Sequence, residues 1–394
     1  LLSRRCRLNN PATISSRRLS VGVLIPLTDA STMHPGFSRS YREARRRFRE
    51  TAEGAGALII SEPYPDCVGP DGEELAQDLA IFGDPDAEKS LLALSGTHGP
   101  EGYAGNAIQL DWIARQACSV PAGVAVALIH GVNPWGFAYG QRTTQNDVDL
   151  NRNFVDDAIR GVQADALFDE IAVSMAIEEP GAAAFAAFHE KRHALIDKHG
   201  VSRYTNILAR GQYSHPQDVI YGGASREWSN RSLEKLLTQH LSQVKQMGLI
   251  DWHTGLGERG ELFFICFNEE PDLFQKAVSW WGSGVERDAG GFDGAELPRY
   301  MGTVCQGVFD FMACASVVGA VIEIGTYPFS QMTDALLVEN WLRSPAGRAS
   351  PDRAHWLAWT EEHFNPASSE WQSSVLSRGR KVMDQALQGV ADWD

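Results

Sequence analysis

The sequence of 394 residues has no long hydrophobic run, no paired cysteines and no excess of basic residues. Its best continuous apolar run, around Val317–Ile322, is far below the ~18 residues that a membrane-spanning helix needs, so we expect no membrane partner. The six cysteines form no CxxC pair, which excludes a disulfide framework and a thiolate zinc cluster and favours a reducing compartment, the cytoplasm. A net charge of −15 argues against nucleic acid as a partner.

The charge is unevenly distributed along the chain. Residues 1–50 contain eleven Arg and three acids, a net charge of +8, so the remaining 344 residues carry −23. The first twenty residues hold five Arg, four Ser and no acid, a composition similar to that of a mitochondrial transit peptide. We expect residues 1–32 to be an unstructured leader and residues 33–394 to form one domain with a helical insertion at about 156–245.

Short aliphatic runs alternate with longer helical patterns from residue 56 onward. This alternation is typical of an α/β domain, and it predicts a mixed, largely parallel central sheet flanked by helices. The predicted strands are 57–60, 90–95, 123–129, 249–252, 262–267 and 317–324. The predicted helices include 38–55, 103–116, 165–176, 182–198 and 232–247, with two more after residue 334.

Two polar clusters follow predicted strands. The turn Thr-His98-Gly-Pro-Glu101 comes directly after one strand, and His253 ends another before a glycine-rich loop. Open α/β sheets place ligand sites at such strand ends, and two imidazoles with one carboxylate suit zinc, which leaves a fourth position for water in catalytic sites. Asp251, on the same side of its strand as His253, can orient that ring or cap the loop. For His98 and Glu101 alone, the alternative is an incidental surface turn.

Two further features point to catalysis. Glu323 lies inside a continuous apolar strand, where a carboxylate is costly unless it is paired or functional, and burial should raise its pKa toward that of a proton carrier. A structural salt bridge is the alternative. The polar segment that contains Arg142, Asn151 and Arg152 can supply donors to a carboxylate and to an oxyanion, unless it is only a solvated loop.

Together these motifs resemble the zinc carboxypeptidase superfamily, which includes carboxypeptidase A and the aspartoacylase and succinylglutamate desuccinylase branch. The resemblance covers about residues 57–330, and the segment that begins at Phe37 resembles a bacterial subgroup. It implies a phosphorylase/hydrolase-like fold and a Zn²⁺-dependent hydrolase of an amide next to a free carboxylate, either a carboxypeptidase or an N-acyl amino acid deacylase. The implied roles are metal ligation by His98, Glu101 and His253 with Asp251 behind, catalysis by Glu323 and Arg142, and binding of the substrate carboxylate by Asn151 and Arg152.

Some features fit less well or point elsewhere. The interval between Arg152 and His253 is longer than in carboxypeptidase A, and the tyrosine that typical peptidases bring over the substrate is not identifiable, with Tyr327 only a nearby candidate. A rival motif, His189-Glu190-Lys-Arg-His193, spells the HExxH of zincin metalloproteases. A non-catalytic binding protein of the same fold is the other alternative.

Overall fold

A computed structural model describes residues 33–289 and 297–394. It contains a seven-stranded sheet with the strand order β1-β2-β4-β3-β5-β7-β6. The strands are β1 (Leu58–Val68), β2 (Glu74–Gly83), β3 (Lys89–Ser95), β4 (Val124–His130), β5 (Gln246–Gly255), β6 (Leu262–Cys266) and β7 (Ser316–Gly325). The neighbours β4, β3, β5 and β7 run parallel, whereas β1, β2 and β6 join antiparallel at the two edges. The predicted mixed, largely parallel sheet is therefore confirmed.

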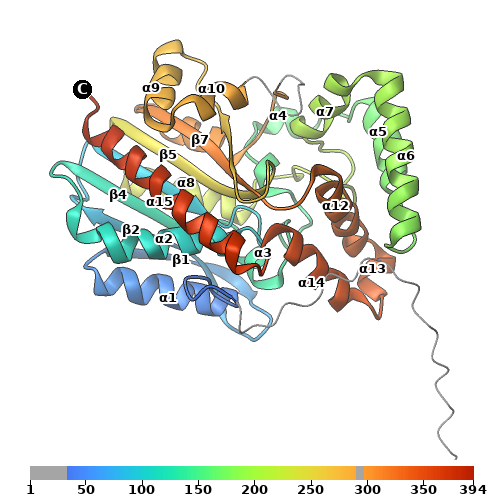
Figure 1. Cartoon of the computed structure of the whole chain (residues 1–394), viewed down its shortest axis with the longest axis horizontal. Coiled ribbons are helices and arrows are strands. Elements are labelled where there is room, and N and C mark those ends of the chain that lie inside the picture. The colour runs from blue at the N-terminus through green and yellow to red at the C-terminus, as the bar shows by residue number, and fades with distance from the viewer. Residues whose placement is uncertain (1–32, 290–296) are drawn as a thin grey trace, which may run out of the picture.

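The helices lie on both faces of the sheet and in a separate group beside its carboxyl edge (Figure 1). They are α1 (Tyr41–Gly54), α2 (Gly102–Gln116), α3 (Pro134–Tyr139), α4 (Asp157–Arg160), α5 (Ala166–Met175), α6 (Ala182–His199), α7 (Val201–Arg210), α8 (Trp228–His240), α9 (Pro271–Trp281), α10 (Ser283–Ala289), α11 (Val304–Phe311), α12 (Phe329–Arg343), α13 (Pro345–Ala349), α14 (Arg353–Phe364) and α15 (Ser369–Ala391).

Each face of the sheet has its own apolar core. One face packs against α1, α2, α9 and α15, and the other against α8 and α11. Helix α1 illustrates why these segments are helical: Ser40 caps it by accepting the N–H of Glu43, and Tyr41, Ala44 and Phe48 recur at helical spacing on its buried side. The strands at the centre of the sheet are buried on both faces, which explains their continuous apolar sequences.

Strand β2 was not predicted. Gln77 and Asp78 lie at its centre, and these polar residues interrupt the apolar run that would have predicted a strand. Both are fully buried: the side-chain nitrogen of Gln77 donates to two backbone carbonyls, and Asp78 pairs with Arg45 at 2.6 Å. The predicted helix 232–247 was also too long, because the chain enters β5 at Gln246.

Helices α5, α6 and α7 form a group with an apolar core of its own, which also contains Leu337 of α12 (Figure 1). This group falls within the interval for which we predicted a helical insertion. The predicted leader, residues 1–32, lies outside the described residues. None of the described helices has the length and apolar composition to cross a membrane.

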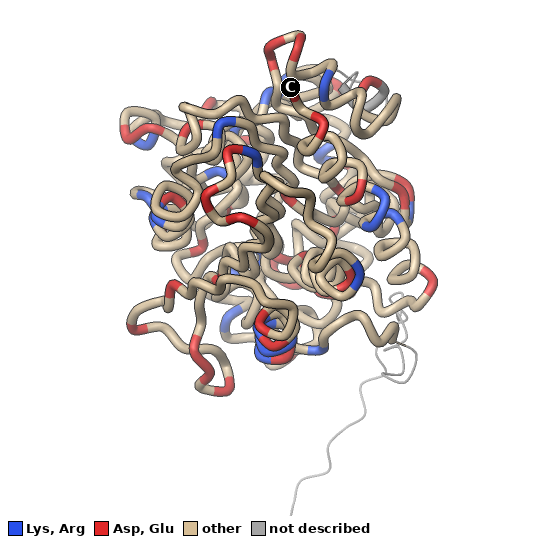
Figure 2. Tube along the Cα trace, turned by 90° about the vertical axis from the view of Figure 1, so that its left-hand side faces the viewer, with Lys and Arg blue, Asp and Glu red and all other residues tan. Residues whose placement is uncertain are grey.

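Acidic and basic residues are dispersed along the chain, and several acidic segments fall in loops that project from the body (Figure 2). Most arginines of α1 have acidic partners: for example, Arg45 pairs with Asp78, and Arg46 pairs with Glu50. The basic N-terminal helix is thus locally compensated within the described part of the chain.

Candidate active site

The turn that carries His98 and Glu101 joins the end of β3 to the start of α2, with Glu101 at the N-cap position. Gly99 lets this turn lie directly on the segment before Arg142. A Cβ added at Gly99 would fall 2.1 Å from the backbone of Gly136, so no other residue fits there without moving the two loops apart. Backbone contact between these loops therefore fixes how His98 lies relative to Arg142.

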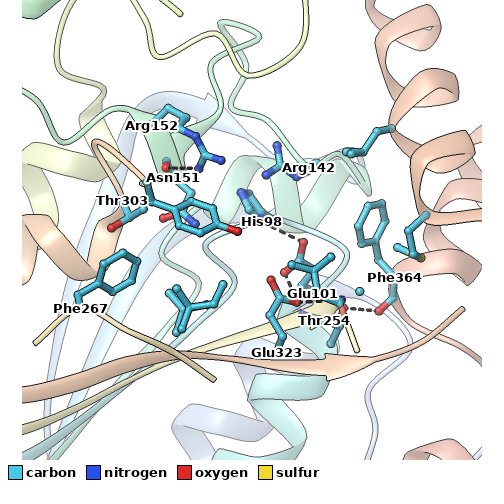
Figure 3. Close-up of a pocket in the computed structure, with 17 residues that line it drawn as sticks. His98, Glu101, Arg142, Asn151, Arg152, Thr254, Phe267, Thr303, Glu323 and Phe364 are labelled. Atoms are coloured by element: carbon cyan, nitrogen blue, oxygen red, sulfur yellow. Dashed lines mark hydrogen bonds and ion pairs between the residues drawn. The ribbon is translucent and has the colours of Figure 1, made fainter. Parts of the chain in front are cut away.

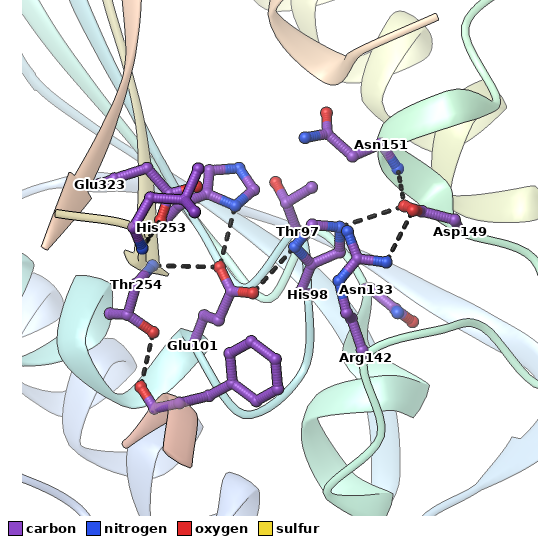
Figure 4. Close-up of polar contacts among 12 residues, drawn as sticks. Thr97, His98, Glu101, Asn133, Arg142, Asp149, Asn151, His253, Thr254 and Glu323 are labelled. Carbon is purple, nitrogen blue, oxygen red and sulfur yellow. Dashed lines mark hydrogen bonds and ion pairs between the residues drawn. The ribbon is translucent and has the colours of Figure 1, made fainter. Parts of the chain in front are cut away.

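His98, Glu101 and His253 come together into one buried group (Figure 4). Their possible ligand atoms lie within 4.8 Å of one another. The Nδ1 atoms of His98 and His253 each lie 2.9 Å from one oxygen of the Glu101 carboxylate. All three side chains are almost completely shielded from solvent.

The outer nitrogens of both imidazoles face carboxylates as well. Nε2 of His98 lies 3.1 Å from Asp149, and Nε2 of His253 lies 3.0 Å from Asp251. A neutral imidazole has one N–H, so a ring that donates to the aspartate through Nε2 turns a lone pair at Nδ1 toward the centre. The two inner nitrogens and Glu101 then form a donor set that fits a cation such as zinc, with the aspartates orienting the rings.

The electrostatics of this group are consistent with a site for a positive charge. Burial opposes ionisation of Glu101, but the two imidazoles outweigh it and hold the pKa of Glu101 well below its usual range. Burial likewise opposes a charge on His253, but Asp251 and Glu101 hold the pKa of His253 well above its usual range. Three acids thus surround two imidazoles, and a cation between them would balance the charge.

Glu323 stands beside this group on the neighbouring strand. β5 and β7 run parallel in a register that pairs His253 with Glu323. The Glu323 side chain is 9% exposed, and its Oε2 accepts the N–H of Leu256 at 3.3 Å. Burial raises the pKa of Glu323 to about 7, with a further upward push from Glu101 that the charge of His253 opposes. Such a carboxylate can accept and release a proton near neutral pH.

Arg142 is held at both its backbone and its side chain. Its Nη1 donates to Asp149 at 2.6 Å, and its backbone N–H donates to Glu339 of α12 at 2.7 Å. Because Asp149 also contacts His98, one carboxylate joins Arg142 to the group formed by His98, Glu101 and His253. We gave no role to Asp149 or Glu339 from the sequence, although Asp149 begins the motif that contains Asn151 and Arg152.

Asn151 and Arg152 lie in a short 3₁₀ turn, Leu150–Arg152, which Asp149 caps. The Oδ1 of Asn151 accepts the N–H of Val304 at 2.9 Å, so its amide nitrogen is the end that remains for a ligand. The Arg152 side chain is buried, and its Nη1 donates to the carbonyl of Asn151, whereas its Nε has no hydrogen-bond partner among the described residues. A buried guanidinium with an unused donor is suited to bind a carboxylate.

These side chains share one cavity of about 150 Å³ (Figure 3). His98, Glu101, Glu323, Arg142, Asn151 and Arg152 all line it. Tyr300 lines it too, with its ring centroid 5.4 Å from the Arg152 guanidinium carbon, and burial raises the pKa of Tyr300 to about 12, so its hydroxyl keeps its proton. Tyr327 instead donates to Glu362 and is not among the lining residues. No local motif marks Tyr300 in the sequence.

The rival HExxH segment lies on α6, away from this cavity. His189 pairs with Asp334 of α12 at 2.8 Å, while Glu190 and His193 are exposed. Within residues 33–289 and 297–394, His98, Glu101 and His253 make up the one group with the composition and spacing of a metal site. The structure therefore gives no support to a zincin centre on α6.

Comparison with known proteins identifies a family by sequence. Residues 37–378 match the family model DUF2817, described as a protein of unknown function. The chain belongs to the DUF2817 family. None of the curated proteins matches this DUF2817 chain.

Solved structures similar to this DUF2817 chain include two carboxypeptidases and an aspartoacylase family protein. Carboxypeptidase A from Helicoverpa armigera is 13% identical, with 82% of this chain and 73% of that chain covered and a TM-score of 0.43. A metallo-carboxypeptidase from Pseudomonas aeruginosa is 15% identical, with 88% and 69% covered and a TM-score of 0.42. An aspartoacylase family protein from Mesorhizobium loti is 13% identical, with 73% and 67% covered and a TM-score of 0.35.

Proposed function

We propose that this protein is a zinc-dependent hydrolase that cleaves an amide bond next to a free carboxylate, as a carboxypeptidase or an N-acyl amino acid deacylase does. The observation that carries this proposal is the meeting, in one cavity, of a metal-ligand group, a buried carboxylate and a buried guanidinium with an unused donor. A binding protein would need the guanidinium but would not need Glu323 beside the metal ligands.

His98, Glu101 and His253 would hold the zinc ion. Bound there, zinc supplies Lewis acidity, which makes water more acidic and polarises a carbonyl oxygen. Asp149 and Asp251, which face the Nε2 atoms, would keep the two imidazoles in the tautomer that leaves a lone pair on Nδ1 for metal binding.

The chain's own residues carry the remaining steps. Glu323 takes a proton from the attacking water and returns it to the nitrogen of the leaving amine, which a pKa near 7 allows in both directions. Arg142 donates to the oxyanion that develops on the scissile carbonyl. Arg152 and the amide nitrogen of Asn151 bind the substrate carboxylate and so orient the bond to be cleaved.

The test is direct. Zinc-loaded protein is incubated with N-acetyl amino acids and with dipeptides, and released amino acid is quantified. We expect release from at least one of the two classes, loss of release after chelation, and recovery when zinc is restored. If neither class is cleaved at full zinc occupancy, the proposed function is wrong. The class that is cleaved faster separates the deacylase from the carboxypeptidase.

A further inference from the structure

The floor of the cavity beyond Glu323 is apolar. This feature bears on which substrates the protein accepts, in addition to the type of reaction. We infer that the substrate carries an apolar side chain, such as that of leucine, on the carbon that bears its free carboxylate. This inference rests on the proposed function, because it takes Arg152 as the partner of the carboxylate.

The register of the two last strands explains why the floor is apolar. β6 and β7 pair antiparallel so that Phe263 lies opposite Glu323 and Ile265 lies opposite Val321. Residues two apart along a strand share a face, so Val321 and Ile265 lie on the same side of the sheet as Glu323, about 7 Å along the strand from it. Ile265, Val321 and Phe267 all line the cavity.

The described residues that line this part of the cavity leave no charged group free for a polar substrate side chain. Among the described residues that line it, the charged or metal-binding side chains are His98, Glu101, Arg142, Arg152 and Glu323, and each already has a role in the reaction. The lining also includes Ile265, Val321, Thr303 and Tyr300, and the ring centroid of Tyr300 lies 6.2 Å from that of Phe267. Oxygen Oγ1 of Thr303 is engaged in the cap of α11, so its polar end is already used.

The carboxylate site and the apolar floor lie on the same side of the reacting groups. Figure 3 shows Arg152, Asn151, Thr303 and Phe267 on one side of His98 and Glu101, and Phe364 on the opposite side. A carboxylate on Arg152 therefore puts its own α-carbon on the Phe267 side, where the side chain of the same residue must also fit. An aspartate or lysine side chain would lose its hydration there without gaining a partner.

The opposite wall offers a matched control. Phe364, Met332 and Leu336 line the cavity on the side that would receive the acyl group. Leu336 and Phe267 are both partly exposed, so an arginine at either position can reach solvent and is compatible with folding. A new positive charge at Phe267 would lie in the proposed side-chain subsite, whereas the same charge at Leu336 would lie outside it.

The first experiment measures kcat/KM for N-acetyl-L-leucine, N-acetyl-L-aspartate and N-acetyl-L-lysine with zinc-loaded protein. Burial of a leucine side chain is worth about 10- to 100-fold, so we expect leucine to exceed both charged compounds by at least about 10-fold. Phe267→Arg should lower the leucine-to-aspartate ratio by at least about 10-fold. Leu336→Arg should leave that ratio within about threefold of the wild-type value, since its charge faces the acyl side. Preference for aspartate or lysine in the wild-type protein, or equal ratios in the two variants, would overturn the inference while leaving the hydrolase assignment in place.

A second measurement is independent of turnover. Calorimetry on the metal-free protein compares L-leucine with L-aspartate, and we expect leucine to bind at least about 10-fold more tightly. Equal or weaker binding of leucine, or no binding of either, would contradict the apolar subsite. If no compound is hydrolysed and leucine still binds preferentially, the proposed function is wrong and the subsite remains.

Discussion

The carboxylate of Glu339 accepts the backbone N–H of Arg142 at 2.7 Å, although 197 residues separate the two in the chain. Glu339 is buried on α12, and its charge also faces Arg142 and Arg343. Glu339 does not line the cavity. We therefore expect it to act on the reaction through Arg142, as a positioning residue.

Replacement of Glu339 should separate its hydrogen bond from its charge. Glu339→Leu removes the acceptor of the Arg142 N–H, and a misplaced Arg142 should lower kcat by roughly 10- to 100-fold with a smaller change in KM. Glu339→Gln keeps an acceptor and should recover most of kcat. Asp334→Asn on the same helix, which weakens only the pair with His189, is the control and should leave kcat near the wild-type value. A parallel loss of kcat and melting temperature in both Glu339 variants would assign Glu339 to stability instead.

Metal content should follow the cavity and not the α6 helix. We expect His98→Ala and His253→Ala to lose bound zinc, because each removes one of three ligands, whereas His189→Ala and His193→Ala should retain it. Atomic absorption on folded, purified variants measures the ratio of zinc to protein. Zinc loss in the two α6 variants with zinc retained in the others would move the metal site to α6.

Glu323→Gln should separate binding of zinc from turnover. The amide keeps the shape of the carboxylate but cannot accept a proton, so we expect full zinc occupancy and a fall in kcat of roughly 10²- to 10⁴-fold. Turnover and zinc content measured on the same preparation decide the outcome. Wild-type turnover at full occupancy would remove Glu323 from the mechanism.

The two arginines should respond differently to the charge of the substrate. Arg152→Lys keeps the positive charge but loses the forked geometry, so kcat/KM should fall sharply for a free-acid substrate and little for the matching amide. Arg142→Lys should slow both compounds alike, because an oxyanion forms from either. The measurement is kcat/KM for the acid and amide pair in both variants. Equal losses for the pair in Arg152→Lys would mean that Arg152 does not bind the carboxylate.

Stability at acidic pH should depend on His130. This ring is fully buried between Tyr41 and Phe48, and burial lowers the pKa of His130 to about 4. Because the unfolded chain takes up the proton near pH 6.5, the folded state should lose up to roughly 3 kcal/mol as the pH falls from about 6.5 to about 4. Urea unfolding of His130→Phe over this range should show a shallower decline than the wild-type protein. Parallel curves would exclude His130 as the cause.

Local sequence patterns predicted the parallel strands and most of the residues of the candidate site, but they did not predict features that depend on distant contacts. His98, Glu101 and His253 are marked by strand-end turns, and Glu323 is marked by a charge in an apolar run, because each signal lies within a few neighbouring residues. Strand β2 was missed because the two carbonyls that accept from its central Gln77, those of Val132 and Ser229, lie far along the chain. The contact between Glu339 and Arg142 and the position of Tyr300 depend on how distant helices and loops pack. The spacing of residues within a short segment cannot predict such contacts.

The close approach of Gly99 and Gly136 has a consequence for how such a site can diverge. Gly136 is confined as well, since a Cβ there would lie 2.4 Å from the side-chain nitrogen of Asn133. Any larger residue at either place would push the turn that carries His98 and Glu101 away from the segment that carries Arg142, even if those three side chains were retained. Two glycines 37 positions apart are thus a stricter sign that this arrangement is intact than the spacing of His98 and Glu101. A chain that lacks the glycines could keep the His98 and Glu101 motif and still fail to bring it against the arginine segment.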